Sequence, residues 1–305
     1  MTTGTPPIVR PPAFAFFVLL FGVFCCSVSV LFLKASHTHP LWVSSLRLLI
    51  AAVALSPLTL RSFATGTALG GAKAALRTLP AAALLAVHFI GWTIGARLST
   101  PANGSLIVNL TTVVMPIVMW AMYRERLVRG EVVGTAIAMV GVMAIVGGHY
   151  KFSAEEFRGD LMCLGAMVLF CFYLALSRRG SAGRSLWMYV VPLYFFAGLI
   201  CMAAAMIARA PLPEASVREW AILACLGLIP TVIGHSSMNW CIARMRGQTV
   251  AIVNLFQFAY AGVGGFFVYG VVPSVWFYPV CALIVLGAVI TIRSAHARVE
   301  VDSES

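Results

Sequence analysis

Long runs of apolar residues, separated by short polar breaks, make up most of this chain of 305 residues. An apolar run of about 20 residues is long enough to form a helix that crosses the hydrocarbon core of a bilayer. Ten such runs follow one another, at residues 14–33, 41–60, 79–97, 102–122, 131–148, 159–177, 187–208, 219–242, 248–269 and 275–293. This pattern predicts an all-α polytopic membrane protein with ten transmembrane helices.

Composition supports a membrane protein and limits what the loops can do. Hydrophobic residues make up 61% of the chain and charged residues 10%, whereas a soluble domain is about 45–50% apolar and about 25% charged. The longest expected loop, 61–78, is rich in Gly, Thr and Ala and too short for a soluble domain. The eight cysteines all lie inside predicted spans and are expected to be small buried hydrophobes, not disulfides or metal ligands. We expect no cofactor and no metal.

The basic residues predict the orientation of the helices. Of the 21 Lys and Arg residues, 14 lie in the N-terminus, the C-terminus and the loops 61–78, 123–130, 178–186 and 243–247, whereas the alternate loops hold six. Cytoplasmic loops carry an excess of Lys and Arg, so both termini are expected in the cytoplasm (N-in/C-in). The net charge of +11 therefore reflects topology, and we expect no nucleic-acid partner.

An internal repeat divides the chain into two halves. An offset of 145 residues maps the letters I-V-N-L at 107–110 onto 252–255, and an offset of 147 maps His88 onto His235. Because the chain has only four asparagines, the pair Asn109 and Asn254 is more informative than matches of Ile or Leu, although chance alignment of apolar helices is the alternative. We predict two five-helix halves, 14–148 and 159–293. An odd number of spans per half makes an inverted repeat, which exposes a central site to the two sides in turn.

Three segments carry a family resemblance: "HPLWVSSLRLLIAAVALSPL" (39–58), "LIVNLTTVVMPIVMWAMYRERLVRGEVVGTAIAMVGV" (106–142) and "GDLMCLGAMVLFCFYLALSRR" (159–179). They resemble the ten-helix EamA-type transporters of the drug/metabolite transporter (DMT) superfamily. The second segment matches that family's pattern at Pro116, Glu125-Arg126, Gly134 and Gly141. The second half departs from it, with Ala261 and Gly270 at the positions equivalent to Pro116 and Glu125.

Polar residues inside predicted spans are the candidates for function, because polar groups in lipid are costly unless they face a partner or a water-filled cavity. On the fourth helix, Asn109 and Thr112 share one face with Pro116, and the 145-residue offset maps these two onto Asn254 and Gln257. We expect a central cavity near the membrane midplane in which these side chains bind a polar substrate. The two asparagines could instead join helices by hydrogen bonds.

The third and eighth helices add a matched pair of histidines. His88 shares a helix face with Trp92, and His235 shares one with Asn239. These side chains are expected to line the same cavity, with Trp92 as an apolar wall, although each histidine could also be an ordinary buried group.

Arg47 is the only basic residue inside a predicted span and away from its ends. It could extend to the outer surface, bond carbonyl groups of neighbouring helices, or hold a substrate carboxylate. The candidate substrate-binding residues are thus Arg47, His88, Trp92, Asn109, Thr112, His235, Asn239, Asn254 and Gln257.

The ten acidic residues all lie in loops or at predicted helix ends. Proton-coupled carriers commonly use a carboxylate inside the membrane, so proton coupling here would have to use His88 or His235, or be absent. The same pattern favours a neutral, zwitterionic or anionic substrate over a cation.

These observations predict a secondary transporter of a small metabolite in the plasma membrane, which in bacteria is the inner membrane. The family resemblance implies export, with amino acids or related polar compounds as substrates. An importer or exchanger of a small anionic or neutral metabolite is the alternative. A membrane-embedded enzyme is disfavoured because the chain contains neither H-E-x-x-H nor G-x-S-x-G, and a scaffold is disfavoured by the short loops. The expected partners are the substrate and the lipid bilayer, and nothing in the sequence indicates the oligomeric state.

Overall fold

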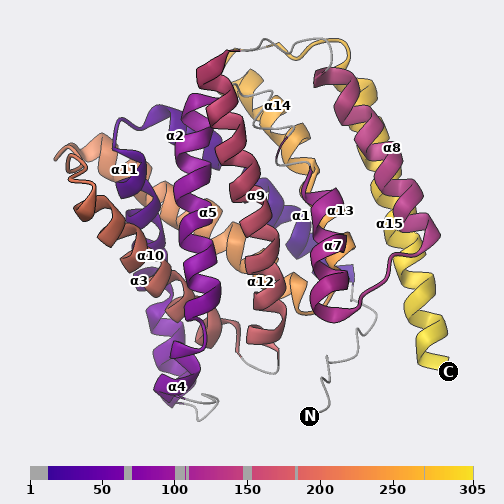
Figure 1. Ribbon diagram of the computed structural model, residues 1–305, viewed down its shortest axis with the longest axis horizontal. Coiled ribbons are helices and arrows are strands. Elements are labelled where there is room, and N and C mark those ends of the chain that lie inside the picture. Colours follow the sequence, from indigo (N-terminus) through magenta and orange to yellow (C-terminus); the bar gives the residue numbers. More distant parts are fainter. Residues whose placement is uncertain are drawn as a thin grey trace.

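The computed structural model is a bundle of long helices (Figure 1). It describes residues 13–64, 71–99, 107, 110–146, 153–182, 185–270 and 272–304. Within these residues, eight helical segments are long and apolar enough to cross a membrane: Ala13–Ala35, Pro40–Ala64, Leu79–Leu98, Ala154–Ser181, Leu186–Ile207, Val217–Ile242, Gly247–Val268 and Phe277–Ala295. A shorter apolar helix, Thr111–Tyr123, lies in the fourth predicted span. The chain is therefore an integral, multi-pass membrane protein.

The elements in chain order are α1 (Ala13–Ser27), α2 (Ser29–Ala35), α3 (Pro40–Ala64), α4 (Gly71–Leu76), α5 (Leu79–Leu98), α7 (Thr111–Tyr123), α8 (Arg129–Val146), α9 (Ala154–Ser181), α10 (Leu186–Ile207), α11 (Val217–Leu226), the π-helix η1 (Gly227–His235), α12 (Ser236–Ile242), α13 (Gly247–Asn254), α14 (Phe256–Tyr269) and α15 (Phe277–Glu304). Three predicted spans are each built from two or three consecutive elements: α1 with α2, α11 with η1 and α12, and α13 with α14.

Close helix pairings hold the bundle together. α8 packs along α15, α5 along α9, α3 along α10, α1 along η1 and α12, and α7 along α13. At the first of these, a Cβ atom on Gly134 would lie 2.4 Å from the carbonyl oxygen of Gly287, and one on Gly287 would lie 2.4 Å from that of Gly134. Two backbones this close leave no room for a side chain, as small-residue helix contacts in membranes require.

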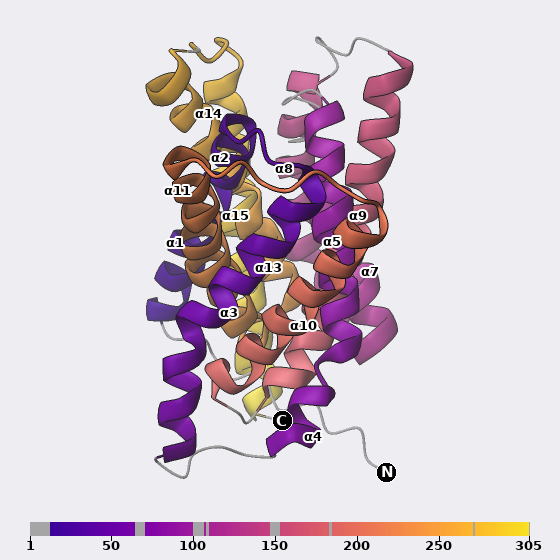
Figure 2. The same ribbon diagram turned by 90° about the vertical axis from the view of Figure 1, so that its left-hand side faces the viewer.

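Helices α5 and α9 run in opposite directions and define the two ends of the bundle. Gly95, near the end of α5, lies against Gly159 near the start of α9, and Gly91 lies against Ala166 one to two turns further along. We call the end where α5 stops and α9 starts the Asp160 end, and the opposite one the Arg178 end. At 1.5 Å rise per residue, Asp160 and Arg178 are about 27 Å apart along α9. Figure 2 shows α2 and α11 at the Asp160 end, with α4 and the C-terminal end of α15 at the other.

The outer surface of the bundle is apolar, unlike that of a soluble protein. Large hydrophobic side chains are exposed on several helices, among them Phe17, Val53, Ile207 and Phe267. Exposed apolar side chains of this size on so many helices fit contact with lipid. All eight cysteines are free, and six of them are buried.

Candidate functional site

A cluster of aromatic rings occupies the middle of the bundle. His88 and Phe89 come from α5, Phe170 and Tyr173 from α9, and His235 from the end of η1. The ring centroids of His235 lie 5.0 Å from Phe89, 6.0 Å from Phe170 and 6.4 Å from both His88 and Tyr173. Phe170 is ten residues from Asp160 and eight from Arg178, so the cluster is about 15 Å and about 12 Å from the two ends of the bundle.

Arg47 enters this cluster from α3 and is almost completely buried, with 1% of its surface exposed. Its guanidinium carbon lies 4.3 Å from the centroid of the Phe89 ring, a cation–π contact. Nε donates to Thr231 Oγ1 at 3.0 Å and Nη1 donates to Ser29 Oγ at 3.2 Å. Within the described residues, Nη2 has no hydrogen-bond partner and no carboxylate pairs with this arginine. A buried charge with neutral partners alone is costly.

Asn239 and His235 present two more polar atoms without partners. The amide nitrogen of Asn239 donates to the Tyr173 hydroxyl at 2.7 Å and to the His235 carbonyl at 2.8 Å. Neither its Oδ1 nor the Nδ1 of His235 has a hydrogen-bond partner in the part of the chain that the structure describes. In contrast, His88 Nδ1 lies 2.7 Å from the Ala166 carbonyl; because a carbonyl only accepts, this nitrogen carries the proton.

Three buried polar atoms of residues in or beside this cluster thus lack a hydrogen-bond partner among the described residues: Arg47 Nη2, His235 Nδ1 and Asn239 Oδ1. The large majority of buried side-chain polar atoms in proteins are hydrogen-bonded, so three such atoms without partners need an explanation. The set combines a cationic donor, an amide acceptor and an imidazole nitrogen, beside aromatic rings. It is suited to a small ligand that carries both a negative group and a hydrogen-bond donor. No trio of His, Cys, Asp or Glu side chains among the described residues could hold a metal ion.

The π-helix η1 positions one side of this site. It begins at Gly227 and contains Pro230, which lacks the N–H that a regular α-helix would use at this position. Thr231 Oγ1 donates to the Leu226 carbonyl at 2.9 Å while accepting from Arg47, and His235 closes the element. Short π-helical segments inside α-helices occur frequently at functional sites.

The predicted site residues fall into separate groups. Arg47, His88, His235 and Asn239 come together in the central cluster, whereas Trp92 is half-buried against a different apolar group that includes Leu33, Val43, Leu223 and Leu226. Asn109 lies outside the described residues.

The remaining candidates lie on α7, α13 and α14. Thr112 is buried on α7, where its hydroxyl donates to Met139 Sδ at 3.4 Å. Its carbonyl accepts from the Gln248 amide at 3.1 Å. Asn254 ends α13, and its Oδ1 accepts from Gln257 Nε2 at 2.5 Å across the break before α14.

Sequence reasoning missed the rings that line the site. Phe89, Phe170 and Tyr173 are ordinary residues of an apolar helix, and neither spacing nor polarity distinguishes them. Thr231 could have been flagged, because it follows Pro230 in a predicted span. The aromatic lining itself becomes visible only when α5, α9 and η1 are packed together.

Comparison with known proteins decides the family. Residues 13–147 and 157–293 each match the model of the EamA-like transporter family. The chain belongs to this family. It is a transporter, and the two matched segments fill nearly its whole length. A curated relative of this EamA-family transporter, "Aromatic amino acid exporter YddG" of Ancylobacter novellus, is 27% identical over 261 residues, which cover 76% of this chain and 86% of that protein.

A solved crystal structure of another protein shares the fold of the EamA-family transporter. It superposes with a TM-score of 0.76 at 18% identity, covering 93% of this chain and 98% of the other. This likeness supports the helical architecture and carries no information on the substrate.

Proposed function

We propose that this transporter exports small polar metabolites, with amino acids and related compounds as the substrate class, by alternating access around the central cluster. The observation that carries the proposal is the buried guanidinium of Arg47, which has no carboxylate partner among the described residues and whose Nη2 makes no hydrogen bond to them. A substrate carboxylate would supply the missing negative charge. Hydrogen bonds to charged groups contribute about 1.5–3 kcal/mol, enough to select anionic or zwitterionic ligands.

The rest of the cluster fits the other parts of an amino acid. Asn239 Oδ1 is an acceptor that can receive a hydrogen bond from an ammonium group. Phe89 and Phe170 provide flat apolar surfaces for a side chain. Contacts between aromatic rings contribute about 0.5–1.5 kcal/mol beyond area burial. The relative from Ancylobacter novellus is named an aromatic amino acid exporter, which supports both export as the direction of transport and amino acids as the substrate class.

We also propose the architecture that alternating access requires: ten spans in two inverted halves, 14–148 and 159–293, in the bacterial inner membrane with both termini cytoplasmic. The helix pairings support it. If each span of one half is replaced by the equivalent span of the other, the pair α5–α9 becomes the pair formed by η1 and α12 with α1, which is also present. The pairs α3–α10, α7–α13 and α8–α15 each join two equivalent spans, so the exchange leaves them unchanged. The repeated family match and the excess of basic residues in alternate loops are independent support.

The polar residues of the fourth and ninth predicted spans belong to the same proposal. α7, which carries Thr112, packs against α9, and α13, which carries Asn254, packs against α12. Both helices thus adjoin elements of the central cluster. We propose that Asn109, Thr112, Asn254 and Gln257 line the path that leads to it, with Trp92 as an apolar wall.

Untargeted comparison of the growth medium tests this function. Cells that produce the transporter should release one or more amino acids or related compounds that cells with an empty vector retain. Arg47→Gln should abolish the release while the protein still accumulates in the membrane. Arg61→Gln, the same change at the exposed end of α3, is the matched control and should release as much as the wild type. If the media of cells with the transporter and of cells with the empty vector contain the same metabolites at the same levels, or if Arg47→Gln exports normally, the proposal is wrong.

A further inference from the structure

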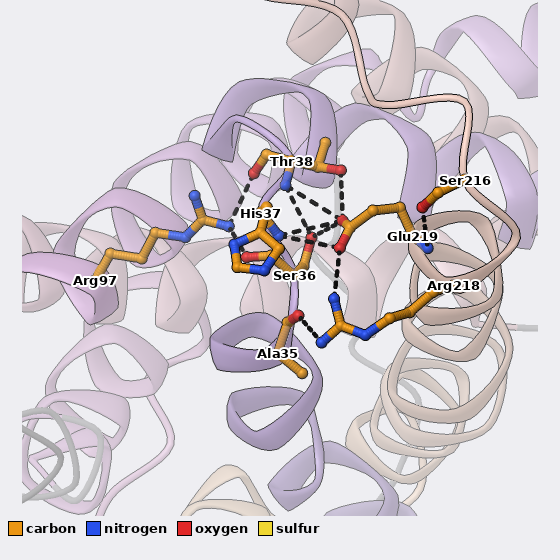
Figure 3. A network of polar contacts seen from close by, with 8 residues as sticks. All are labelled: Ala35, Ser36, His37, Thr38, Arg97, Ser216, Arg218 and Glu219. Carbon is orange, nitrogen blue, oxygen red and sulfur yellow. Dashed lines mark hydrogen bonds and ion pairs between the residues drawn. The ribbon is translucent and has the colours of Figure 1, made fainter.

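A buried carboxylate at the Asp160 end of the bundle binds a loop from the other half of the chain (Figure 3). Glu219, in the first turn of α11, is 1% exposed. Its carboxylate accepts hydrogen bonds from Ser36 Oγ at 2.8 Å and Thr38 Oγ1 at 2.9 Å, and from the backbone N–H groups of His37 at 3.2 Å and Thr38 at 3.3 Å. Arg218 Nη1 lies 3.4 Å from Glu219 Oε1, and the Arg218 side chain is largely exposed. We call residues 36–38 the α2–α3 loop.

The Glu219 side chain does not fold back onto the start of its own helix. Ser216 caps α11 by accepting from the Glu219 backbone N–H at 3.1 Å, and in a capping box the glutamate side chain returns to the N-cap residue. Here the carboxylate extends to the α2–α3 loop instead. From the opposite side, Arg97 Nη2 at the end of α5 donates to the carbonyls of Ser36 at 3.1 Å and Thr38 at 2.8 Å.

An apolar layer lies beneath this contact. Leu33 of α2, Val43 of α3 and Leu223 of α11 form a buried group, against which Trp92 of α5 packs. Trp92 is four residues beyond His88 toward the Asp160 end, so this layer lies between the α2–α3 loop and the central cluster. The layer and the loop therefore lie, in that order, on the Asp160 side of the central cluster.

A second polar network lies at the Arg178 end. Glu125, in the loop after α7, pairs with Arg178 of α9, and its Oε1 accepts from the Gly247 backbone N–H at 3.0 Å. Arg246 Nε lies 2.6 Å from Glu131 Oε1 at the start of α8. Both ion pairs join a carboxylate of the first half to an arginine of the second, as Glu219 joins the second half to the first.

We propose that Glu219 is the latch of the gate at the Asp160 end, that Glu125 with Arg178 is the latch of the opposite gate, and that transport opens them in turn. In the structure both latches are formed, one on each side of the central cluster. The Glu219 latch can separate because most of its partners are neutral groups of a surface loop, which water can solvate once they part. The assignment of the Asp160 end to the outside of the cell rests on the proposed topology.

Accessibility of the central cluster tests the latches without any substrate. Ser236 is 3% exposed, directly follows His235, and its hydroxyl lies 3.1 Å from the buried Tyr194 hydroxyl, so the thiol introduced by Ser236→Cys reports water access to the buried interior next to the central cluster. A membrane-impermeant maleimide is applied to right-side-out and to inside-out vesicles, and labelling of the peptide that contains position 236 is quantified by mass spectrometry, apart from the native cysteines.

Glu219→Gln in the Ser236→Cys protein should raise labelling in right-side-out vesicles about tenfold. Loss of one charge-assisted hydrogen bond shifts the equilibrium between the closed and the open gate by about this factor. Arg178→Gln should raise labelling in inside-out vesicles and lower it in right-side-out ones. Glu214→Gln, an exposed carboxylate in the loop before α11, and Arg179→Gln, an exposed neighbour on α9, are matched controls that should change neither.

Equal labelling of Glu219→Gln and Glu214→Gln in both vesicle orientations would overturn the proposal. If Glu219→Gln does not accumulate, Ser36→Ala with Thr38→Val removes two donors and keeps the carboxylate; this pair should shift labelling in the same direction, and no shift would equally refute the latch. Opposite shifts in the two latch variants together with no exported metabolite would uphold the latches and reject the proposed substrate class.

Discussion

Replacing Arg47 by methionine separates a role in substrate binding from a role in stability. Methionine is of similar length but has no charge and no donors. The substitution removes the free Nη2, the hydrogen bonds to Thr231 and Ser29, and the cation–π contact with Phe89. If Arg47 holds a substrate carboxylate, the lost charge-assisted bonds amount to about 1.5–3 kcal/mol, which weakens binding roughly tenfold to hundredfold.

The effect on stability is expected to be small. Two hydrogen bonds from the charged guanidinium are lost, at about 1.5–3 kcal/mol each. Against this, the buried charge no longer has to be desolvated, which costs several kcal/mol for an ion without a counter-ion. The two contributions nearly cancel, so the melting temperature of Arg47→Met should stay close to that of the wild type or rise.

Binding and thermal unfolding are measured on the same purified protein in detergent. Isothermal titration with an amino acid that the wild type releases gives the dissociation constant, and scanning fluorimetry gives the melting temperature. Arg61→Met on the exposed end of α3 is the control for a lost positive charge. A variant that binds as tightly as the wild type but melts far lower would show that Arg47 is structural, and the reasoning would be refuted.

Two further substitutions test the packing and the aromatic lining. Gly134→Leu places a side chain where a Cβ would already lie 2.4 Å from the Gly287 carbonyl oxygen. Overpacking costs about 1–3 kcal/mol or more, so the melting temperature of this variant should fall. Gly165 has open space around it, so Gly165→Leu should leave the melting temperature unchanged. An equal fall in both would contradict the close α8–α15 contact. Phe170→Leu should weaken binding of aromatic amino acids about 2–10-fold relative to aliphatic ones, because a ring contact contributes about 0.5–1.5 kcal/mol; competition assays that find both classes weakened equally would rule out a ring-stacking role.

The positions of most helices could be predicted from apolar run length, because the thickness of the bilayer sets it. The runs 41–60, 79–97 and 187–208 agree closely with α3, α5 and α10. The breaks within the first, eighth and ninth spans could not be predicted this way, since a run of apolar letters does not report backbone dihedrals. Pro230 marks the π-helix in retrospect, and the ninth span breaks at Leu255, directly after Asn254.

The polar half of the candidate site was visible in the sequence and the apolar half was not. Arg47, His88, His235 and Asn239 were identified because such groups are costly in lipid. Phe89, Phe170 and Tyr173 are as ordinary in a membrane helix as their neighbours, so only packing shows that they surround the histidines. Glu219 was expected at a helix end, where it lies, but its bonds to the α2–α3 loop depend on contacts between residues 181 to 183 positions apart.

The central claim is that a buried arginine binds the substrate of an exporter, and efflux from proteoliposomes tests it most directly. Vesicles containing the wild type or Arg47→Met are loaded with an equimolar mixture of amino acids, and the contents are followed by mass spectrometry. The wild type should lose at least one amino acid well above the leak of protein-free vesicles, and Arg47→Met should retain it. Equal rates for the two proteins, or no loss from the wild type, would contradict the account.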